Sequence, residues 1–97
     1  MTKYAKGRRL EWKTRDVLVS EGYQVARMAG SKGPVDIIAW NGQETLFIQV
    51  KANNPPGPGE RDVLRTLPVP PHSRVQFWVW KDRVRVPVRE TLRGWWP

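Results

Sequence analysis

The stretch 35–51 constrains the fold of this chain more than any other. Two runs of β-forming residues flank Asn41-Gly42, and such a pair is a strong signal for a β-hairpin. In the second run, aliphatic residues at positions 46, 48 and 50 alternate with Thr45, Phe47, Gln49 and Lys51. Side chains of a strand alternate between faces, so Gln49 and Lys51 lie side by side on the face opposite the aliphatics.

The length of the hairpin loop decides where Asp36 points. With a two-residue turn or a four-residue loop at 41–44, Asp36 lies opposite Gln49 or one diagonal step away, on the same face; an odd loop turns it away. An acid, an amide oxygen and the ammonium of Lys51 then meet, which is the minimum needed to hold Mg²⁺ beside a phosphodiester. The alternative is a half-buried hairpin in which Asp36 simply pairs with Lys51.

The composition indicates one small basic domain. The chain of 97 residues carries 17 Lys and Arg against 9 Asp and Glu, a net charge of +8, which favours nucleic acid as the partner and an anionic membrane surface second. It has no cysteine, which excludes a disulfide framework and thiolate zinc sites. No apolar run approaches membrane-spanning length and no signal-peptide core is present, so we expect a soluble, cytoplasmic protein with no membrane partner.

The first 22 residues predict a helix preceded by a short arm. Residues 1–6 are expected to form a loose basic arm, and 7–21 a helix with one buried apolar stripe that ends at Gly22. Glu11 lies at the edge of that stripe and faces the body of the domain. An i,i+4 ion pair with Arg15 and a role in the site are equally compatible with this position.

The remaining elements follow from local patterns. We expect a strand over 23–28, a glycine-rich loop over 29–34 that suits a phosphate, a helix over 60–67, and strands over 75–80 and 83–88. In the last of these, the alternation predicts three valines facing the core and Pro87 outward on an edge strand. The C-terminal Trp95-Trp96 is a candidate dimer contact.

The order helix–strand–strand–strand–helix–strand, with a helix-one glutamate and Asp…Gln-x-Lys on the central hairpin, resembles the PD-(D/E)XK nucleases. Residues 22–31 and 34–39 are more closely similar to the archaeal-type Holliday junction resolvases, small basic homodimers that cut four-way DNA junctions symmetrically with Mg²⁺. The resemblance covers about 7–67. It implies an α/β, restriction-endonuclease-like fold with a mixed central sheet flanked by helices, in a single nuclease domain over 1–97.

The resemblance also assigns site residues. Its catalytic set falls on Glu11, Ser31, Asp36, Gln49 and Lys51, and its metal ligands on Glu11, Asp36, Gln49 and the carbonyl of Val50. Gln49 stands where the family usually has a second acid, although relatives of the Mrr type also use Gln-x-Lys. A neutral amide binds Mg²⁺ more weakly than a carboxylate, so the two acids matter more.

The implied function is a Holliday junction resolvase of prokaryotic, archaeal or phage origin that uses Mg²⁺, with Mn²⁺ as a possible substitute, and no small-molecule cofactor. A four-way DNA junction and a second copy of the chain are the expected partners. The residues expected to hold DNA phosphates are Lys3, Lys6, Arg8, Arg9, Arg27, Ser31 and Lys32. Three alternatives stay open: a related nuclease of the Mrr type or one acting on flaps or single strands, a non-catalytic DNA-binding module on the same fold, and an RNA-binding protein.

Overall fold

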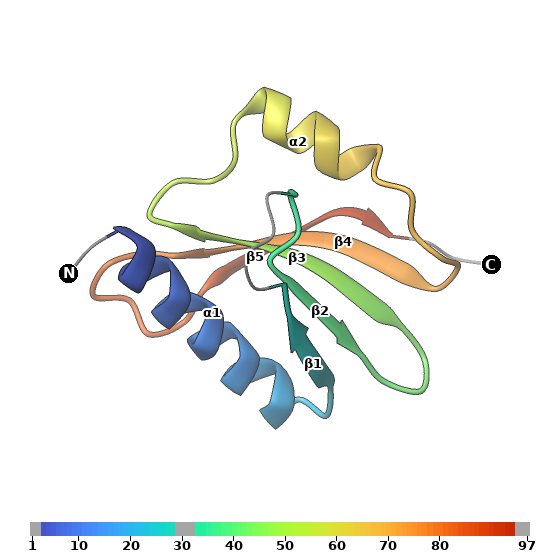
Figure 1. Cartoon of the computed structure of the whole chain (residues 1–97), viewed down its shortest axis with the longest axis horizontal. Coiled ribbons are helices and arrows are strands. Elements are labelled where there is room, and N and C mark those ends of the chain that lie inside the picture. The colour runs from blue at the N-terminus through green and yellow to red at the C-terminus, as the bar shows by residue number, and fades with distance from the viewer. Residues whose placement is uncertain (1–2, 29–32, 95–97) are drawn as a thin grey trace.

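The computed structural model describes residues 3–28 and 33–94, and the side chains from residue 6 onward within them. A five-stranded sheet lies between two helices (Figure 1). Its strands follow chain order, and every neighbouring pair is antiparallel except β3 and β4, which are parallel and joined through α2. The predicted mixed sheet flanked by helices is confirmed. The elements are α1 (Lys3–Ser20), β1 (Gln24–Arg27), β2 (Ile37–Trp40), β3 (Thr45–Ala52), α2 (Pro58–Arg65), β4 (Ser73–Trp80) and β5 (Val88–Gly94).

Helix α1 packs one apolar stripe on the sheet. Leu10, Thr14 and Leu18, spaced four residues apart, are its buried side chains. The helix already begins at Lys3, so the expected loose arm over residues 1–6 is wrong for residues 3–6. Lys and Ala are strong helix formers, and nothing in that segment interrupts the helix. The predicted end is confirmed, because Gly22 follows with a φ of 95°, a conformation that glycine adopts without strain.

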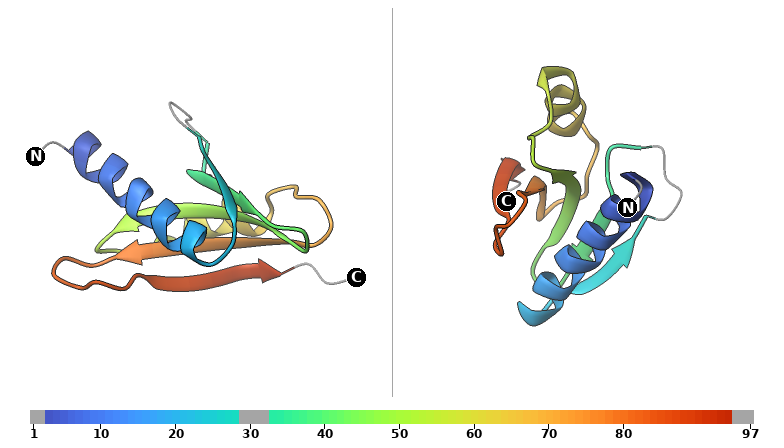
Figure 2. Two further views of the ribbon diagram at one scale, coloured as in Figure 1. Left: turned by 90° about the horizontal axis from the view of Figure 1, so that it is seen from below. Right: turned by 90° about the vertical axis from the view of Figure 1, so that its left-hand side faces the viewer.

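The two faces of the sheet are covered by different helices (Figure 2). On the α1 side, Leu10 and Leu18 pack with aliphatic residues of β2 and β3 and with Trp78 and Trp80. On the other side, α2 contributes the fully buried Leu64 and contacts β4 and β5. Strand β4 is therefore buried on both faces, as expected for a central strand next to a parallel crossover.

The polar group inside the α1 face is fully paired. Thr14 is buried, and its Oγ1 donates to the carbonyl of Leu10 at 2.8 Å. The same Oγ1 accepts a hydrogen bond from Nε1 of Trp80 at 2.8 Å. Because an unpaired polar atom costs free energy when buried, this pair of bonds allows a large tryptophan to fill the space between β4 and α1.

The C-terminal strand differs from its prediction. We expected a strand over 83–88 with valines inward and Pro87 outward; instead the strand begins at Val88, Pro87 is buried, and Val84 and Val86 are exposed. A tight turn after β4 would have placed Pro87, which has no N–H, within the ladder that pairs with β4. The chain therefore forms a wide loop over 81–87 before it pairs with β4. Trp95 and Trp96 lie outside the described residues.

No helix in the described ranges has the length and apolar character that crossing a membrane requires.

Candidate functional site

The central hairpin fixes the position of Asp36. Its loop has the four residues 41–44, one of the two even lengths considered, and the Oδ1 of Asn41 accepts two backbone N–H groups of that loop at 2.8 Å each. The ladder pairs Ile37 with Ile48, so its continuation puts Asp36 opposite Gln49. The backbone N–H of Asp36 still donates to the carbonyl of Ile48 at 2.9 Å. The register predicted from the sequence is confirmed.

A groove of about 580 Å³ lies between α1 and the adjoining ends of β2 and β3. Glu11 and Lys6 line it from the helix, and Asp36, Val50 and Lys51 line it from the strands. The carboxyl of Asp36 and the ammonium of Lys51 thus face the same space. The structure places these two groups where the sequence predicts them.

Asp36 is held by the backbone of the neighbouring strand. Its Oδ2 accepts a hydrogen bond from the N–H of Val50 at 2.8 Å. Burial raises the pKa of Asp36 above its ordinary value, and the negative charge of Glu11 raises it further, whereas the Val50 N–H and the charge of Lys51 act in the opposite direction. The raised pKa means that burial disfavours the ionised form of this carboxyl, so a cation bound beside it would stabilise the carboxylate.

The side chain of Glu11 is directed from α1 toward β1. Its Oε1 lies 3.3 Å from Nη1 of Arg27, and both side chains are mostly buried. Arg15, the expected i,i+4 partner, pairs with Asp16 at 3.5 Å instead. The intrahelical ion pair is therefore not formed, and the body-facing interpretation of Glu11 is confirmed by its place in the groove.

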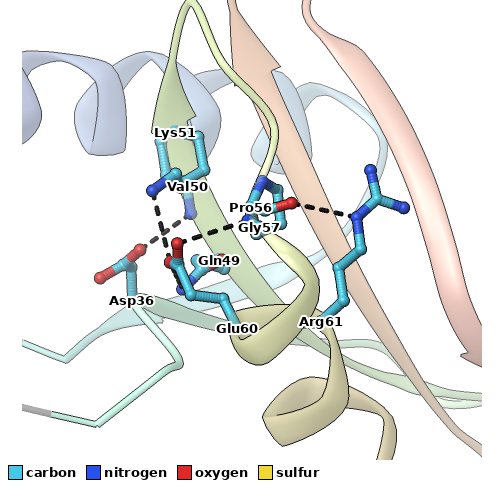
Figure 3. Close-up of polar contacts among 8 residues, drawn as sticks. All are labelled: Asp36, Gln49, Val50, Lys51, Pro56, Gly57, Glu60 and Arg61. Atoms are coloured by element: carbon cyan, nitrogen blue, oxygen red, sulfur yellow. Dashed lines mark hydrogen bonds and ion pairs between the residues drawn. The ribbon is translucent and has the colours of Figure 1, made fainter.

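Gln49 faces a second, adjoining pocket in which the structure adds Glu60 of α2. The Oε2 of Glu60 accepts from Nε2 of Gln49 and from Nζ of Lys51, each at 3.4 Å (Figure 3). Gly33 and Pro34 also line this pocket of about 340 Å³. The Oε1 of Gln49 is buried and has no hydrogen-bond partner among the residues that the structure describes. A buried amide oxygen in this state has unused acceptor capacity.

Glu60 was missed in the sequence analysis. The available signal was its place in the first turn of a helix that crosses between parallel strands, because that turn lies near the carboxyl end of β3. Its Oε1 also accepts the backbone N–H of Gly57 at 3.5 Å, as the N3 glutamate of a capping box does. The same carboxylate thus caps α2 and contacts two site residues.

The donor set fits a hard divalent cation. The groove supplies the carboxylates of Glu11 and Asp36, and Gln49 adds an unpaired amide oxygen from the adjoining pocket. Mg²⁺ and Mn²⁺ bind such oxygens and keep several waters of their own. No three Asp, Glu, His or Cys side chains of residues 3–28 and 33–94 gather as a metal-binding group. Any such cation therefore depends on the amide, on backbone or on substrate oxygens as well.

The residues predicted to hold DNA have different surroundings. Arg8 and Arg9 are exposed on α1, Lys6 pairs with Asp82 at 3.2 Å, and Arg27 is engaged by Glu11. Lys3 lies in the first turn of α1, but its side chain is outside the described part. Ser31 and Lys32 are also outside the described residues. A DNA-binding role for all of these stays a prediction.

Comparisons with known proteins bear on the family and the fold of the chain. The family model for archaeal Holliday junction resolvase (Hjc) matches residues 2–55, more than half of the chain and all of the central hairpin. The structure is similar to that of Archaeoglobus fulgidus Hjc, a Holliday junction resolvase from an archaeal hyperthermophile, with a TM-score of 0.69 and 24% sequence identity over 90% of this chain and 73% of that one. This likeness confirms the predicted restriction-endonuclease-like fold. A search of the curated proteins finds no match.

Proposed function

The chain belongs to the archaeal Holliday junction resolvase (Hjc) family, and on that premise we propose that it hydrolyses phosphodiesters at four-way DNA junctions with the help of a divalent metal ion. The observation that carries this proposal is the convergence of Asp36 and Lys51 on one groove, with Glu11 on its opposite wall. A metal-coordinating acid next to an ammonium is the equipment that phosphodiester hydrolysis requires.

Each site residue has a role that follows from its chemistry. Glu11, Asp36 and the Oε1 of Gln49 would hold the metal ion, together with the carbonyl of Val50. When bound, Mg²⁺ supplies Lewis-acid stabilisation of the phosphate and makes a nearby water more acidic. The ammonium of Lys51 orients the attacking water and offsets the negative charge that builds on the phosphate in the transition state.

Glu60 keeps two of these groups in place. Its contact with Nε2 of Gln49 fixes the orientation of the amide, so that within the described residues Oε1, and not the NH₂ group, is left without a partner. Its contact with Nζ of Lys51 holds the ammonium at the edge of the groove. An entering phosphate competes for the same ammonium, so Lys51 is ready to move from Glu60 to the substrate.

Paired, symmetric nicks require two such grooves. One chain carries one groove, and a junction is cut on two opposed strands. We therefore expect a homodimer with two-fold symmetry, which places one active site at each strand. The net charge of +8 supplies the attraction for phosphates, so shape rather than base sequence is expected to dominate selection of the junction.

The test compares substrates and variants in parallel. Wild-type protein with Mg²⁺ is incubated with a four-way junction and with duplex, flapped and single-stranded DNA of matched sequence. We expect paired nicks in the junction alone. Lys51→Ala should slow nicking by roughly 100–1,000-fold while leaving junction affinity largely unchanged, and Arg65→Gln, on the exposed side of α2, serves as the control. Equal cutting of all substrates would favour a related nuclease of the Mrr type or one acting on flaps.

A non-catalytic DNA-binding module is the second candidate. The neutral Gln49 and the lack of a three-acid group among the described residues favour it. Junction binding without any nicking in Mg²⁺ or Mn²⁺ would select this alternative over the nuclease.

A further inference from the structure

A second, strongly basic cleft adjoins the groove. It has a volume of about 280 Å³ and lies between the N-terminal half of α1 and the loop 81–87, which Figure 1 shows beside the first turns of that helix. Among the described side chains, six cationic ones line it, three from each segment, against one acid, Asp82. The six are Lys6, Arg9, Lys13, Lys81, Arg83 and Arg85.

The single acid of the cleft is already engaged. Asp82 accepts hydrogen bonds from Nζ of Lys6 and from Nδ2 of Asn53, both at 3.2 Å, and these bonds lower the pKa of Asp82. Its one negative charge offsets one of the six cations. No ion pair joins Arg9, Lys81 or Arg85 to any residue within the described ranges. The cleft therefore carries excess positive charge, which favours binding of an anion.

The loop that carries these cations is anchored to the sheet. The backbone N–H of Asp82 donates to Oδ1 of Asn53 at 2.9 Å, directly after β3, and the N–H of Val84 donates to the carbonyl of Lys81 at 3.2 Å. Bringing like charges together costs free energy, and side-chain hydrogen bonds hold the loop in this position against that repulsion. The cations are thus presented by a fixed backbone.

The cleft continues the catalytic groove. Lys6 and Leu10 line both spaces, so a polyanion that lies in the cleft passes directly to Asp36 and Lys51. Exposed Val84 stands among the cations and offers an apolar contact for a sugar. Consecutive phosphates with sugars between them have this alternating chemistry.

We propose that the cleft formed by α1 and the loop 81–87 binds backbone phosphates of the DNA arm whose strand is cut, with Lys81, Arg83 and Arg85 as phosphate contacts. The inference rests on the proposed function and extends it to the loop before β5, most of which the alternation of valines predicts to be a strand. Phosphate contacts fix register, so this cleft sets how far along the arm the scissile bond lies.

Salt dependence measures these contacts directly. Junction affinity is followed by fluorescence anisotropy at several salt concentrations, without a divalent metal so that no cleavage occurs. Each lost phosphate contact lowers the slope of log affinity against log salt by about one. The double variant Arg83→Gln, Arg85→Gln should therefore lower the slope by about two and weaken binding at least tenfold at low salt. Arg85→Gln alone should lower the slope by about half as much as the double variant does.

Arg65→Gln is the matched control, because Arg65 is an exposed arginine of α2 whose only ion pair within the described residues is with Asp62. It should leave the slope unchanged, and all variants should melt at the wild-type temperature. A double variant with the wild-type slope would overturn the cleft proposal while leaving the nuclease intact. A competition experiment compares inorganic phosphate with chloride at equal ionic strength. If phosphate displaces DNA more than chloride does, the cleft is a site for a single anion, and the proposal of a DNA-backbone cleft would be wrong. A wild-type protein that binds no DNA would overturn both.

The position of the nicks supplies a second readout. If the cleft fixes register, the double variant should spread its cuts over several bonds of the arm, whereas Arg65→Gln should cut at the wild-type bond. Slower cutting at an unchanged, single bond would contradict the role in register.

Discussion

The carboxylate of Asp36 accepts the backbone N–H of Val50 at 2.8 Å, across the point where β2 separates from β3. This bond joins Asp36, which directly precedes β2, to Val50, the neighbour of Lys51 on β3. The acid and the lysine thus keep a fixed relation that depends on backbone rather than on flexible side chains. Burial nevertheless dominates and raises the pKa of Asp36, so the metal-free groove resists ionisation of its own acid.

Asp36→Asn tests whether burial of the ionised carboxylate destabilises the metal-free protein. With its raised pKa, folded Asp36 holds a proton more tightly than the unfolded chain does. Its contribution to stability is therefore full below the ordinary pKa of 3.8 and is lost as the pH rises through the raised value. Asn can still accept the Val50 N–H but does not ionise. At pH 7 without metal, the variant should melt at the wild-type temperature or higher, although its nicking should fall by at least about 100-fold.

The melting temperatures of the wild type and of Asp36→Asn should also respond differently to added Mn²⁺. The ion should raise the melting temperature of the wild type, because a cation favours the ionised carboxylate, and should raise that of Asp36→Asn much less. Wild-type nicking should also weaken as the pH falls toward the raised pKa. A variant that melts well below the wild type without metal would contradict the raised pKa.

Glu60→Gln tests the contribution of α2 to the site. Gln can also cap a helix at N3, so the free energy of unfolding should change by less than about 0.5 kcal/mol. Loss of the charge near Gln49 and Lys51 should weaken Mn²⁺ binding roughly 10-fold, as measured by titration calorimetry. Asp62→Asn removes the same charge from the same helix, and the side chain of Asp62 pairs with Arg65 of α2 rather than with β3. Equal effects of the two variants would indicate net charge rather than contact.

Thr14→Val tests the polar bond inside the core. The substitution keeps the volume but leaves Nε1 of Trp80 buried without its acceptor, and an unpaired buried donor costs about 1–3 kcal/mol. The loss should appear in the free energy of unfolding from urea titration. Thr66→Val is the control. Within the described residues the exposed hydroxyl of Thr66 bonds only to backbone carbonyls of its own helix, so this substitution should cost less than about 1 kcal/mol.

The local pattern around the hairpin predicted its register for an even loop, and the loop length itself came from the structure. Alternation and an even loop together leave only one face for Asp36, Gln49 and Lys51, and the ladder has that geometry. The buried stripe of α1 was predictable for the same reason, because a period of 3.6 residues selects one side of a helix. These are properties of neighbouring residues in one segment.

Contacts between distant segments were not predictable in this way. The partner of Glu11 is Arg27 on β1, and Glu60 reaches β3 only after the crossover of α2 is placed. The valines before β5 have the alternation of a strand, but the buried Pro87 and the pairing with β4 displace the strand to Val88. In each case the deciding free energy comes from tertiary packing, which periodicity in one segment does not contain.

Gln49→Glu asks whether the amide limits metal binding. A carboxylate is the stronger ligand for Mg²⁺, so the variant should bind Mn²⁺ roughly tenfold more tightly at pH 8. The new acid also lies beside Glu60, and two carboxylates this close raise the pKa of the pair. Metal binding then displaces a proton, so the gain in affinity should shrink as the pH falls.

The double variant Gln49→Glu, Glu60→Gln separates the two effects. It keeps one acid and one amide with their positions exchanged, so like-charge repulsion disappears while the carboxylate stands at position 49, in the pocket next to the groove. The four proteins form a cycle in which the coupling between positions 49 and 60 should exceed 0.5 kcal/mol, as measured by Mn²⁺ titration at pH 6 and pH 8. Strictly additive affinities at both pH values would show that Glu60 does not act through residue 49, and its contact with Lys51 would then carry its whole effect.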